Sequence, residues 1–296
     1  MAQPCVVCHG GVGGRPEDSD GCRRAAERGL AALAGGAHAL DAAVEARVVL
    51  EDDPRYNAGT GANLRLDGHT IELDAAVMDS DGRIGAVAAV RSVKNPVRVA
   101  RRVLDTSHVF LAGDGATRFA ELCGLRAEVP PTPGALEDHA RRRKAWAAGE
   151  LPADAGWSAE RLRESWNLPA SRAEALGCDT VGAVVRDSAG RFGLANSTGG
   201  TSWALLGRVG DSPLPGCGYW AGPAGAVAAT GIGEEIIRKV LCRTVYDWLA
   251  AGASPQDACA RGVKLLPTGV AVGLIAVTPS AHGWAADRGM PVAALT

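Results

Sequence analysis

The sequence predicts an α/β protein in which β-sheets are covered by helices on their outer faces. Two observations lead to this prediction. Segments with helical spacing and segments with strand-like apolar content occur in both halves of the chain, separated by one long polar connection. The chain has 296 residues and 47% hydrophobic content, which is ample for a large buried core. The 39 glycines and 4% aromatic residues fit a compact fold built from small side chains.

The first half contains the signals of a mixed fold. The Asp81-Gly82 turn lies between two strand-like segments and predicts a hairpin. Pro96 stands where a helix is expected to begin. The expected elements are a strand and glycine turn at 4–14, helices at 22–36 and 39–53, strands at 70–79 and 82–93, a helix at 95–107, a strand at 108–115 and a helix at 116–124.

The segment 128–178 differs from the rest of the chain. It contains five prolines, many charges and only weak helical periodicity. About 50 residues without a clear element are uncommon inside a compact domain, and such segments are usually functional or disordered. Taken alone, this segment is most simply a solvated insertion.

The second half returns to strand and helix patterns. Ser188-Ala189-Gly190 is expected to join the first two strands. The expected elements are strands at 180–187 and 191–198, a glycine-rich loop at 199–222, a strand at 225–231, helices at 234–251 and 255–266, and strands at 268–279 and 283–289.

Composition excludes several classes of function. A net charge of −2 gives no reason to expect nucleic acid or an anionic membrane as a partner. We find no apolar run of the roughly 18–20 residues that cross a bilayer, and we expect no secretory signal. Eight scattered cysteines, including the pair Cys5 and Cys8, indicate buried thiols rather than a metal or disulfide framework, and a cytoplasmic location.

The familiar glycine motifs are absent. "HGGVGG" does not match GxGxxG, and neither GxxxxGK[ST], GxSxG nor HExxH occurs. "ATGIGEEIIRK" places glycines before a helix, but Glu234 and Glu235 would repel a phosphate there. We therefore expect no nucleotide site.

Thr180 lies where the polar connection meets a predicted strand. Taken alone it is an ordinary strand residue. A threonine hydroxyl is a weak nucleophile that needs a base. Cutting the chain just before the threonine would supply one, because a freed α-amine has a pKa of about 7.7–8.0. Such a design needs a segment that can be cut and a rigid strand after it, and residues 128–186 provide both.

Ordered motifs around this position resemble the plant-type asparaginase/isoaspartyl aminopeptidase family of N-terminal-nucleophile hydrolases. In the second half they are "DTVGAV", "STGG", "GRVGDSP" and "ATGIGE". The first half adds "HGGVGG", "ALDAAVEA", "LEDDPRYNAGTGANL" and "ELDAAVMD". The likeness covers nearly the whole chain except 128–178. It implies a four-layer αββα sandwich, in which 1–179 and 180–296 become two fragments of one globular domain, and a homodimer of cleaved protomers.

The resemblance implies roles for the residues around Thr180. The Asp179–Thr180 bond would be cut by the Thr180 hydroxyl, which then attacks a substrate amide to form a β-aspartyl ester. Thr198 matches a threonine that hydrogen-bonds the nucleophile, although alone it would be a strand-end residue capping a turn. Thr230 and Gly231 match an oxyanion-hole pair.

The resemblance also implies how substrate is recognised. Isoaspartyl dipeptides and L-asparagine carry a free α-carboxylate and a free α-ammonium. Arg208 would bind the carboxylate and Asp211 the ammonium, with Gly233 as a further backbone contact. Without the resemblance, Arg208 and Asp211 would be taken for a surface ion pair. Asn57 matches a residue beside the nucleophile, but alone it would be a turn asparagine.

No catalytic cofactor is implied, but a structural sodium ion is. The loop "LEDDPRYNAGTG" resembles a family loop whose main-chain carbonyls hold sodium. The matching carbonyls are those of Leu50, Glu51, Asp53, Tyr56, Ala58 and Thr60.

Some residues depart from the family pattern and leave alternatives. Asp179 stands where many members have glycine, and it resembles the glycosylasparaginase and taspase branches. A glycosylasparaginase-like enzyme that cleaves the sugar–asparagine bond is therefore an alternative. A non-catalytic relative that binds acidic amino acids is another. Trp203 and Ala204 stand near where a basic residue is common, which leaves the leaving-group preference open.

Overall fold

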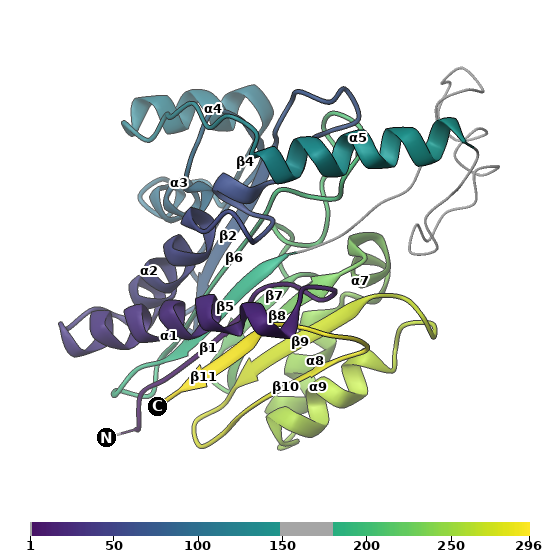
Figure 1. Cartoon of the computed structure of the whole chain (residues 1–296). Helices are drawn as coiled ribbons and strands as arrows, with labels where there is room; N and C mark the ends of the chain where they lie inside the picture. The colour runs from purple at the N-terminus through teal and green to yellow at the C-terminus, as the bar shows by residue number, and fades with distance from the viewer. Residues whose placement is uncertain (1, 149–179) are drawn as a thin grey trace.

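Two β-sheets form the centre of the molecule, as the computed structural model in Figure 1 shows. The structure describes residues 2–148 and 180–296. One sheet has the strand order β11-β1-β5-β6-β2-β3-β4, and the other has the order β10-β9-β8-β7. The strands are β1 (Cys5–His9), β2 (Leu73–Asp79), β3 (Ile84–Val90), β4 (Phe110–Ala112), β5 (Val181–Arg186), β6 (Phe192–Thr198), β7 (Tyr219–Gly222), β8 (Gly225–Gly231), β9 (Val272–Val277), β10 (His282–Ala286) and β11 (Val292–Leu295).

The strand after Thr180 lies near the middle of the larger sheet. β5 pairs antiparallel with β1 on one side and with β6 on the other, and every residue of β5 is buried. Its sequence, "VGAVVR", is rich in β-branched and small residues, which suits a strand covered on both faces. The predicted strands at 180–187 and 191–198 are thus confirmed as neighbours, with Val181 opposite Ser197.

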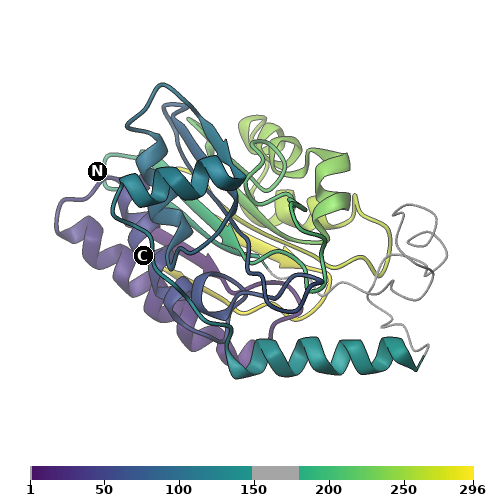
Figure 2. The same cartoon turned by 90° about the horizontal axis from the view of Figure 1, so that it is seen from above.

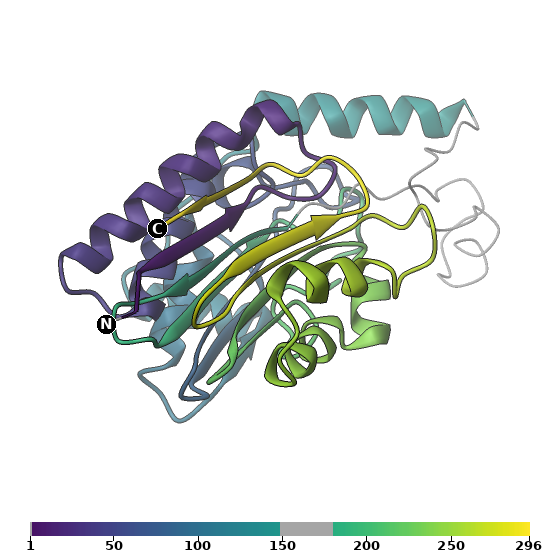
Figure 3. The same cartoon turned by 90° about the horizontal axis from the view of Figure 1, so that it is seen from below.

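An apolar layer joins the two sheets face to face. It contains Val184 and Leu194 of the larger sheet together with Ala228 and Ile275 of the smaller one. A second apolar cluster lies between the larger sheet and helices α1 to α4, and a third between the smaller sheet and helices α8 and α9 (Figures 1 and 3). These helices are α1 (Ser19–Ala34), α2 (Ala39–Asp52), α3 (Pro96–Val103), α4 (Gly113–Leu122), α8 (Leu241–Ala250) and α9 (Pro255–Val263). The mixed α/β class is confirmed.

The two cysteines of the CxxC sequence lie on opposite faces of β1. Cys5 packs in the layer between the sheets, whereas Cys8 packs in the cluster beneath the helices. Residues three apart in a strand point to opposite sides, so the two thiols cannot bind one metal ion. Burial raises the pKa of both thiols, which is typical of unreactive core cysteines.

Part of the segment 128–178 is helical, which corrects the prediction of a connection without an element. α5 (Pro133–Ala147) extends past the sheets in Figures 1 and 2. The Thr132 hydroxyl accepts a hydrogen bond from Ala135 N at 3.1 Å and caps the helix start. Most of its described side chains are exposed to solvent. A helix without a buried face needs no regular spacing of apolar residues, which is why its sequence shows little helical periodicity.

Two other expectations were wrong in the second half. The single helix expected at 234–251 is divided into α7 (Gly233–Lys239) and α8, because Val240 between them has a left-handed backbone with φ 45°. The loop expected at 199–222 includes β7, and the unpredicted β11 extends the larger sheet beside β1. In the part of the chain that the structure describes, no helix is long and apolar enough to span a bilayer.

The left-handed backbone at Val240 provides a stability test. A β-branched residue pays roughly 1–2 kcal/mol for this conformation, whereas glycine adopts it freely. The side chain is 46% exposed, so little packing is lost on its removal. Val240→Gly is expected to raise the free energy of unfolding by about 0.5–1 kcal/mol. Lys239→Gly, one residue earlier and helical, should lower it by a similar amount in the same urea titration. A destabilised Val240→Gly variant would contradict this account.

Candidate active site

Thr180 lies between the two sheets at the beginning of β5 and is only 5% exposed. Its backbone nitrogen donates a hydrogen bond to Thr230 Oγ1 at 3.2 Å. Its hydroxyl shares a hydrogen bond with the Ser212 hydroxyl at 2.9 Å. Both functional groups of Thr180 are thus held by hydroxyls from other segments. Asp179 lies outside the described residues.

Thr230 connects Thr180 to the N-terminal glycine turn. Besides the Thr180 nitrogen, its Oγ1 accepts a hydrogen bond from Val12 N at 3.2 Å. A hydroxyl has two acceptor positions and one donor, so the Thr230 O–H can still donate to a third group. Gly231 follows in β8, and a Cβ there would lie 2.2 Å from Ala271 O. The chain needs glycine here because β9 passes so close.

Arg208 forms a two-pronged ion pair with Glu234 at the start of α7. The Arg208 Nε and Nη2 atoms donate to the two carboxylate oxygens at 2.9 and 2.8 Å. Burial raises the pKa of Glu234, but the hydrogen bonds and charge of Arg208 outweigh this and lower it overall. Arg208 is therefore already engaged by a carboxylate, in the geometry that a guanidinium offers to any carboxylate ligand.

Asp211 is a buried carboxyl group beside this pair. Burial raises the pKa of Asp211 to about 7, and the Arg208 charge lowers it only in part. Its Oδ2 atom has no hydrogen-bond partner among the described residues. A buried carboxylate with an open acceptor is suited to a cationic ligand.

Gly233 brings the backbone of α7 close to both groups. A Cβ at this position would lie 3.0 Å from Arg208 Nη2 and 3.0 Å from Asp211 Oδ1. Any larger residue would push into Arg208 and Asp211. The three residues predicted to recognise substrate are therefore brought together.

Asn57 holds the turn that follows β6. Its amide nitrogen donates to Gly200 O at 2.6 Å, and its oxygen accepts from Asn63 N at 2.9 Å. The Thr198 hydroxyl accepts a hydrogen bond from Gly200 N at 2.9 Å. Asn57 and Thr198 thus fix the same glycine turn beside Thr180.

A small cavity of about 10 Å³ lies between these groups, with room for about one water molecule. It brings together five of the predicted site residues. It is lined by Thr180, Thr198, Gly200, Thr201, Arg208, Gly210, Asp211, Ser212 and Gly231.

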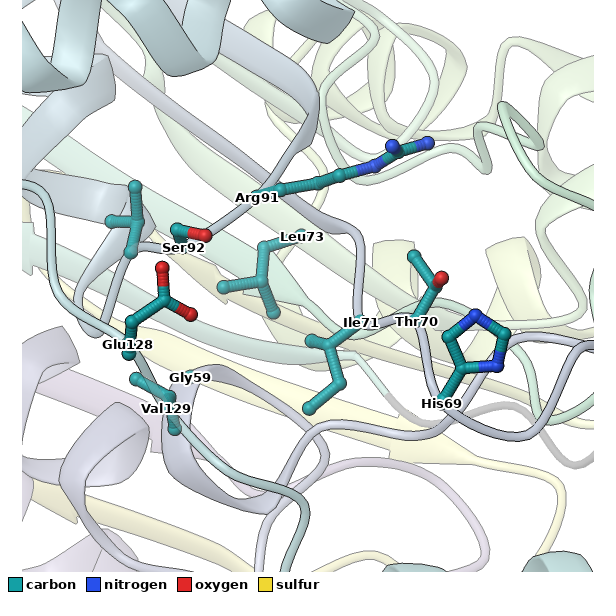
Figure 4. Close-up of a pocket in the computed structure, with 10 residues that line it drawn as sticks. Gly59, His69, Thr70, Ile71, Leu73, Arg91, Ser92, Glu128 and Val129 are labelled. Carbon is teal, nitrogen blue, oxygen red and sulfur yellow. The ribbon is translucent and has the colours of Figure 1, made fainter.

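A larger cavity of about 190 Å³ lies elsewhere and shares none of these residues. Figure 4 shows Glu128 and Val129 on one side of it and His69 and Thr70 on the other, with the Arg91 side chain extending away from Glu128. Within 2–148 and 180–296 there is no cluster of three or more His, Cys, Asp or Glu side chains that could hold a metal ion.

Carbonyl groups crowd around two glycines in the loop after α2. A Cβ at Gly59 would lie 2.6 Å from Glu51 O, and one at Gly61 would lie 2.2 Å from Tyr56 O. Several backbone oxygens thus approach the interior of this loop closely. Neutral oxygen donors of this kind are the type of ligand that a hard monovalent cation prefers.

Two residues of the site were not predicted from the sequence. Ser212 follows Asp211 in "GRVGDSP", and its contact with Thr180 depends on the fold. Glu234 was considered only as a residue that repels phosphate, and its pairing with Arg208 was not foreseen. In the sequence, only its place in the motif "GRVGDSP" could have pointed to Ser212 as a site residue.

Comparison with known proteins identifies the family to which this chain belongs. The model of the asparaginase family matches residues 2–290. The chain belongs to the asparaginase family. An isoaspartyl peptidase/L-asparaginase of Xenopus laevis is 36% identical over 293 residues, which cover 96% of this chain and 88% of that protein. One of Danio rerio is 40% identical over 265 residues, with 86% and 79% covered. A plant-type L-asparaginase of Pyrococcus horikoshii is 36% identical over 270 residues, with 88% and 84% covered.

The raised pKa of Asp211 predicts a pH-dependent cost in stability. Since the folded pKa is about 7 and the unfolded value about 3.9, the folded state holds the proton more tightly. Stability from this group is therefore present below about pH 4 and is lost as the pH rises through about 7. Asp211→Asn is expected to raise the free energy of unfolding at pH 8 by on the order of 1–3 kcal/mol. Thermal or urea unfolding should show a smaller gain at pH 5, and equal gains at both pH values would contradict this account.

Proposed function

We propose that this member of the asparaginase family is an autoprocessing threonine amidohydrolase that cleaves isoaspartyl dipeptides and L-asparagine. The proposal rests on one observation: a threonine whose nitrogen and hydroxyl are both hydrogen-bonded lies beside a cavity lined by charged side chains. Thr180 N and Oγ1 are held by Thr230 and Ser212, and the cavity beside them is lined by Arg208 and Asp211. The names of the relatives from Xenopus laevis and Pyrococcus horikoshii support the same substrates.

The first reaction is proposed to be self-cleavage. The Thr180 hydroxyl attacks the carbonyl carbon of Asp179, and the C–N bond breaks as the acyl group moves to Oγ1. Water then hydrolyses the ester, which leaves a carboxylate on Asp179 and a free amine and hydroxyl on Thr180. The amine inherits the position of the backbone nitrogen beside Thr230.

The second reaction uses the same hydroxyl on substrate. The Thr180 amine takes the proton from Oγ1 as the hydroxyl attacks the side-chain amide, and it returns a proton to the departing amine. The resulting β-aspartyl ester is hydrolysed by water to aspartate. Thr230 and Gly231 are proposed to stabilise the oxyanion, and Thr198 to hold the nucleophile through the adjacent turn.

Arg208 and Asp211 are proposed to bind the substrate's α-carboxylate and α-ammonium. The substrate carboxylate must share the guanidinium with Glu234 or displace it. Gly233 lets the α7 backbone approach both charges. Asn57 is assigned to holding the Gly200 turn at the wall of the cavity.

The overall assembly is proposed to follow the family. The two facing sheets and their outer helices support a four-layer αββα sandwich. Strands β1 and β2 of the first fragment flank β5 and β6 of the second, so both fragments would remain one globular domain after the cut. Two cleaved protomers would form a homodimer. We propose no catalytic cofactor, and a structural sodium ion on the carbonyls of Leu50, Glu51, Asp53, Tyr56, Ala58 and Thr60.

Replacing Thr180 tests the proposal as a whole. Intact mass measurement of the wild type should show two fragments divided between Asp179 and Thr180, with hydrolysis of β-aspartyl-leucine and L-asparagine. Thr180→Ala should remain one chain and lose at least about 10⁴-fold in kcat/KM, since it lacks the attacking oxygen. Hydrolysis that survives in Thr180→Ala would refute the mechanism. Faster turnover of N-acetylglucosaminyl-asparagine than of β-aspartyl-leucine would instead favour the glycosylasparaginase alternative.

Ser212 is expected to orient the nucleophile. Ser212→Ala removes its hydrogen bond to the Thr180 hydroxyl, which should lower kcat about tenfold and leave KM within about twofold, because one hydrogen bond contributes roughly 0.5–1.5 kcal/mol. Ser202→Ala is a matched control, since Ser202 lies in the same loop and donates to Asp138 outside the cavity. Equal kcat values for the two variants would contradict this role for Ser212.

A further inference from the structure

Arg65 is a fully buried arginine that the proposed mechanism does not use. Its exposed fraction is 0%, although an arginine is almost never fully buried unless it is paired. Burial lowers the pKa of Arg65, and the charges of Asp74 and Glu72 oppose this. Such a costly charge needs compensation from specific contacts.

The contacts of Arg65 lead to the loop that carries Arg208. Its Nη2 donates to the backbone oxygen of Arg208 at 3.2 Å. Its Nη1 lies beneath the other end of that loop, where a Cβ on Gly200 would come within 2.5 Å of it. One guanidinium therefore donates a hydrogen bond to the backbone of the proposed carboxylate-binding residue and fills the space beside Gly200, in the turn after Thr198.

Glu72, the residue directly before β2, completes this arrangement. Its Oε2 atom pairs with Arg65 Nε at 3.2 Å and accepts a hydrogen bond from Gly207 N at 2.7 Å. Its Oε1 atom accepts from Arg91 Nε at 3.1 Å. The N–H of Gly207 and the C=O of Arg208 are thus both hydrogen-bonded to one buried ion pair.

Backbone hydrogen bonds fix the same two segments along their length. Trp203 N donates to Leu64 O at 3.2 Å, and Leu66 N donates to Ala204 O at 2.9 Å. Arg65 therefore lies at the centre of a paired strip, with its side chain directed toward Arg208 rather than toward solvent. This placement connects the strand β2 to the proposed substrate loop.

We propose that Arg65 is a positioning residue that sets the place of Arg208 for the substrate's α-carboxylate. It acts through the Arg208 carbonyl and, with Glu72, through Gly207 N. This inference rests on the proposed function, because it assigns Arg208 to the α-carboxylate. Loss of Arg65 would weaken ligands that carry an α-carboxylate and leave the threonine chemistry in place.

The test compares two ligands that differ only in that carboxylate. L-Aspartate is the proposed product, and β-alanine is the same molecule without its α-carboxylate. Calorimetric titration of cleaved Arg65→Lys should show the Kd of L-aspartate raised about tenfold, equal to about 1.4 kcal/mol, with the Kd of β-alanine changed less than about twofold. The KM for β-aspartyl-leucine should rise about tenfold, with kcat within about threefold.

Arg47→Lys is the matched control. Arg47 is equally buried, but its hydrogen bonds go to Ser197 rather than to the loop at 199–211. Both variants should unfold at lower temperature, but only Arg65→Lys should change the ratio of the two Kd values. If Arg65→Lys does not fold, Glu72→Gln removes its charged partner and should shift the ratio in the same direction.

The outcomes separate this inference from the proposed function. Wild-type protein that neither cuts itself nor hydrolyses β-aspartyl-leucine would refute the proposed function. Wild-type protein that binds L-aspartate, with an unchanged Kd ratio in the variant, would overturn the role of Arg65. Equal weakening of both ligands would also overturn it, because a general packing defect does not distinguish the carboxylate.

Discussion

The position of Thr180 depends on its hydrogen bonds to Thr230 and Ser212. These two hydroxyls come from β8 of the smaller sheet and from the loop before β7, whereas Thr180 directly precedes β5 of the larger sheet. These two hydrogen bonds to Thr180 therefore require the two sheets to face one another at a fixed distance. The apolar layer that contains Val184 and Ile275 fixes that distance, because close-packed interiors do not deform continuously.

Charge burial is the main cost of the site. Burial disfavours the charged forms of Asp211 and Arg65, and the Arg208 side chain beside them is only 13% exposed. Glu234 and Glu72 reduce this cost by pairing with the two arginines, and glycines at 200 and 233 give the charged groups space. Because these contacts hold the loop at 199–211 in place, Arg208 and Asp211 can bind a small zwitterion without the loop becoming ordered on binding. Such preorganisation favours binding.

The sequence predicted the strands and most helices because their apolar patterns are local. The hairpin at Asp81-Gly82 and the strands after Thr180 follow from spacing and turn residues alone. The site residues were predicted differently, through motifs whose order resembled a family. In the structure, Thr198, Arg208, Asp211 and Gly231 line one cavity with Thr180.

Features that arise from tertiary packing could not be predicted. The left-handed Val240 that divides α7 from α8 is β-branched, so propensity argues against it. The exposed helix α5 carries almost no periodic signal, and its residues read as a charged linker. The hydrogen bonds of Ser212 to Thr180, of Glu234 to Arg208 and of Arg65 to Arg208 join residues 26 to 143 positions apart in the chain, and no spacing rule connects such distant positions.

The most direct test of the account is to capture the covalent intermediate. Cleaved wild-type protein mixed with excess L-asparagine should be quenched in acid within milliseconds and digested for mass spectrometry. We expect one aspartyl group to be esterified to the fragment that begins at Thr180, and Thr180→Ser to carry the same adduct on its serine. An adduct on any other residue, or turnover with no adduct under conditions where ester hydrolysis limits the rate, would contradict a nucleophilic Thr180.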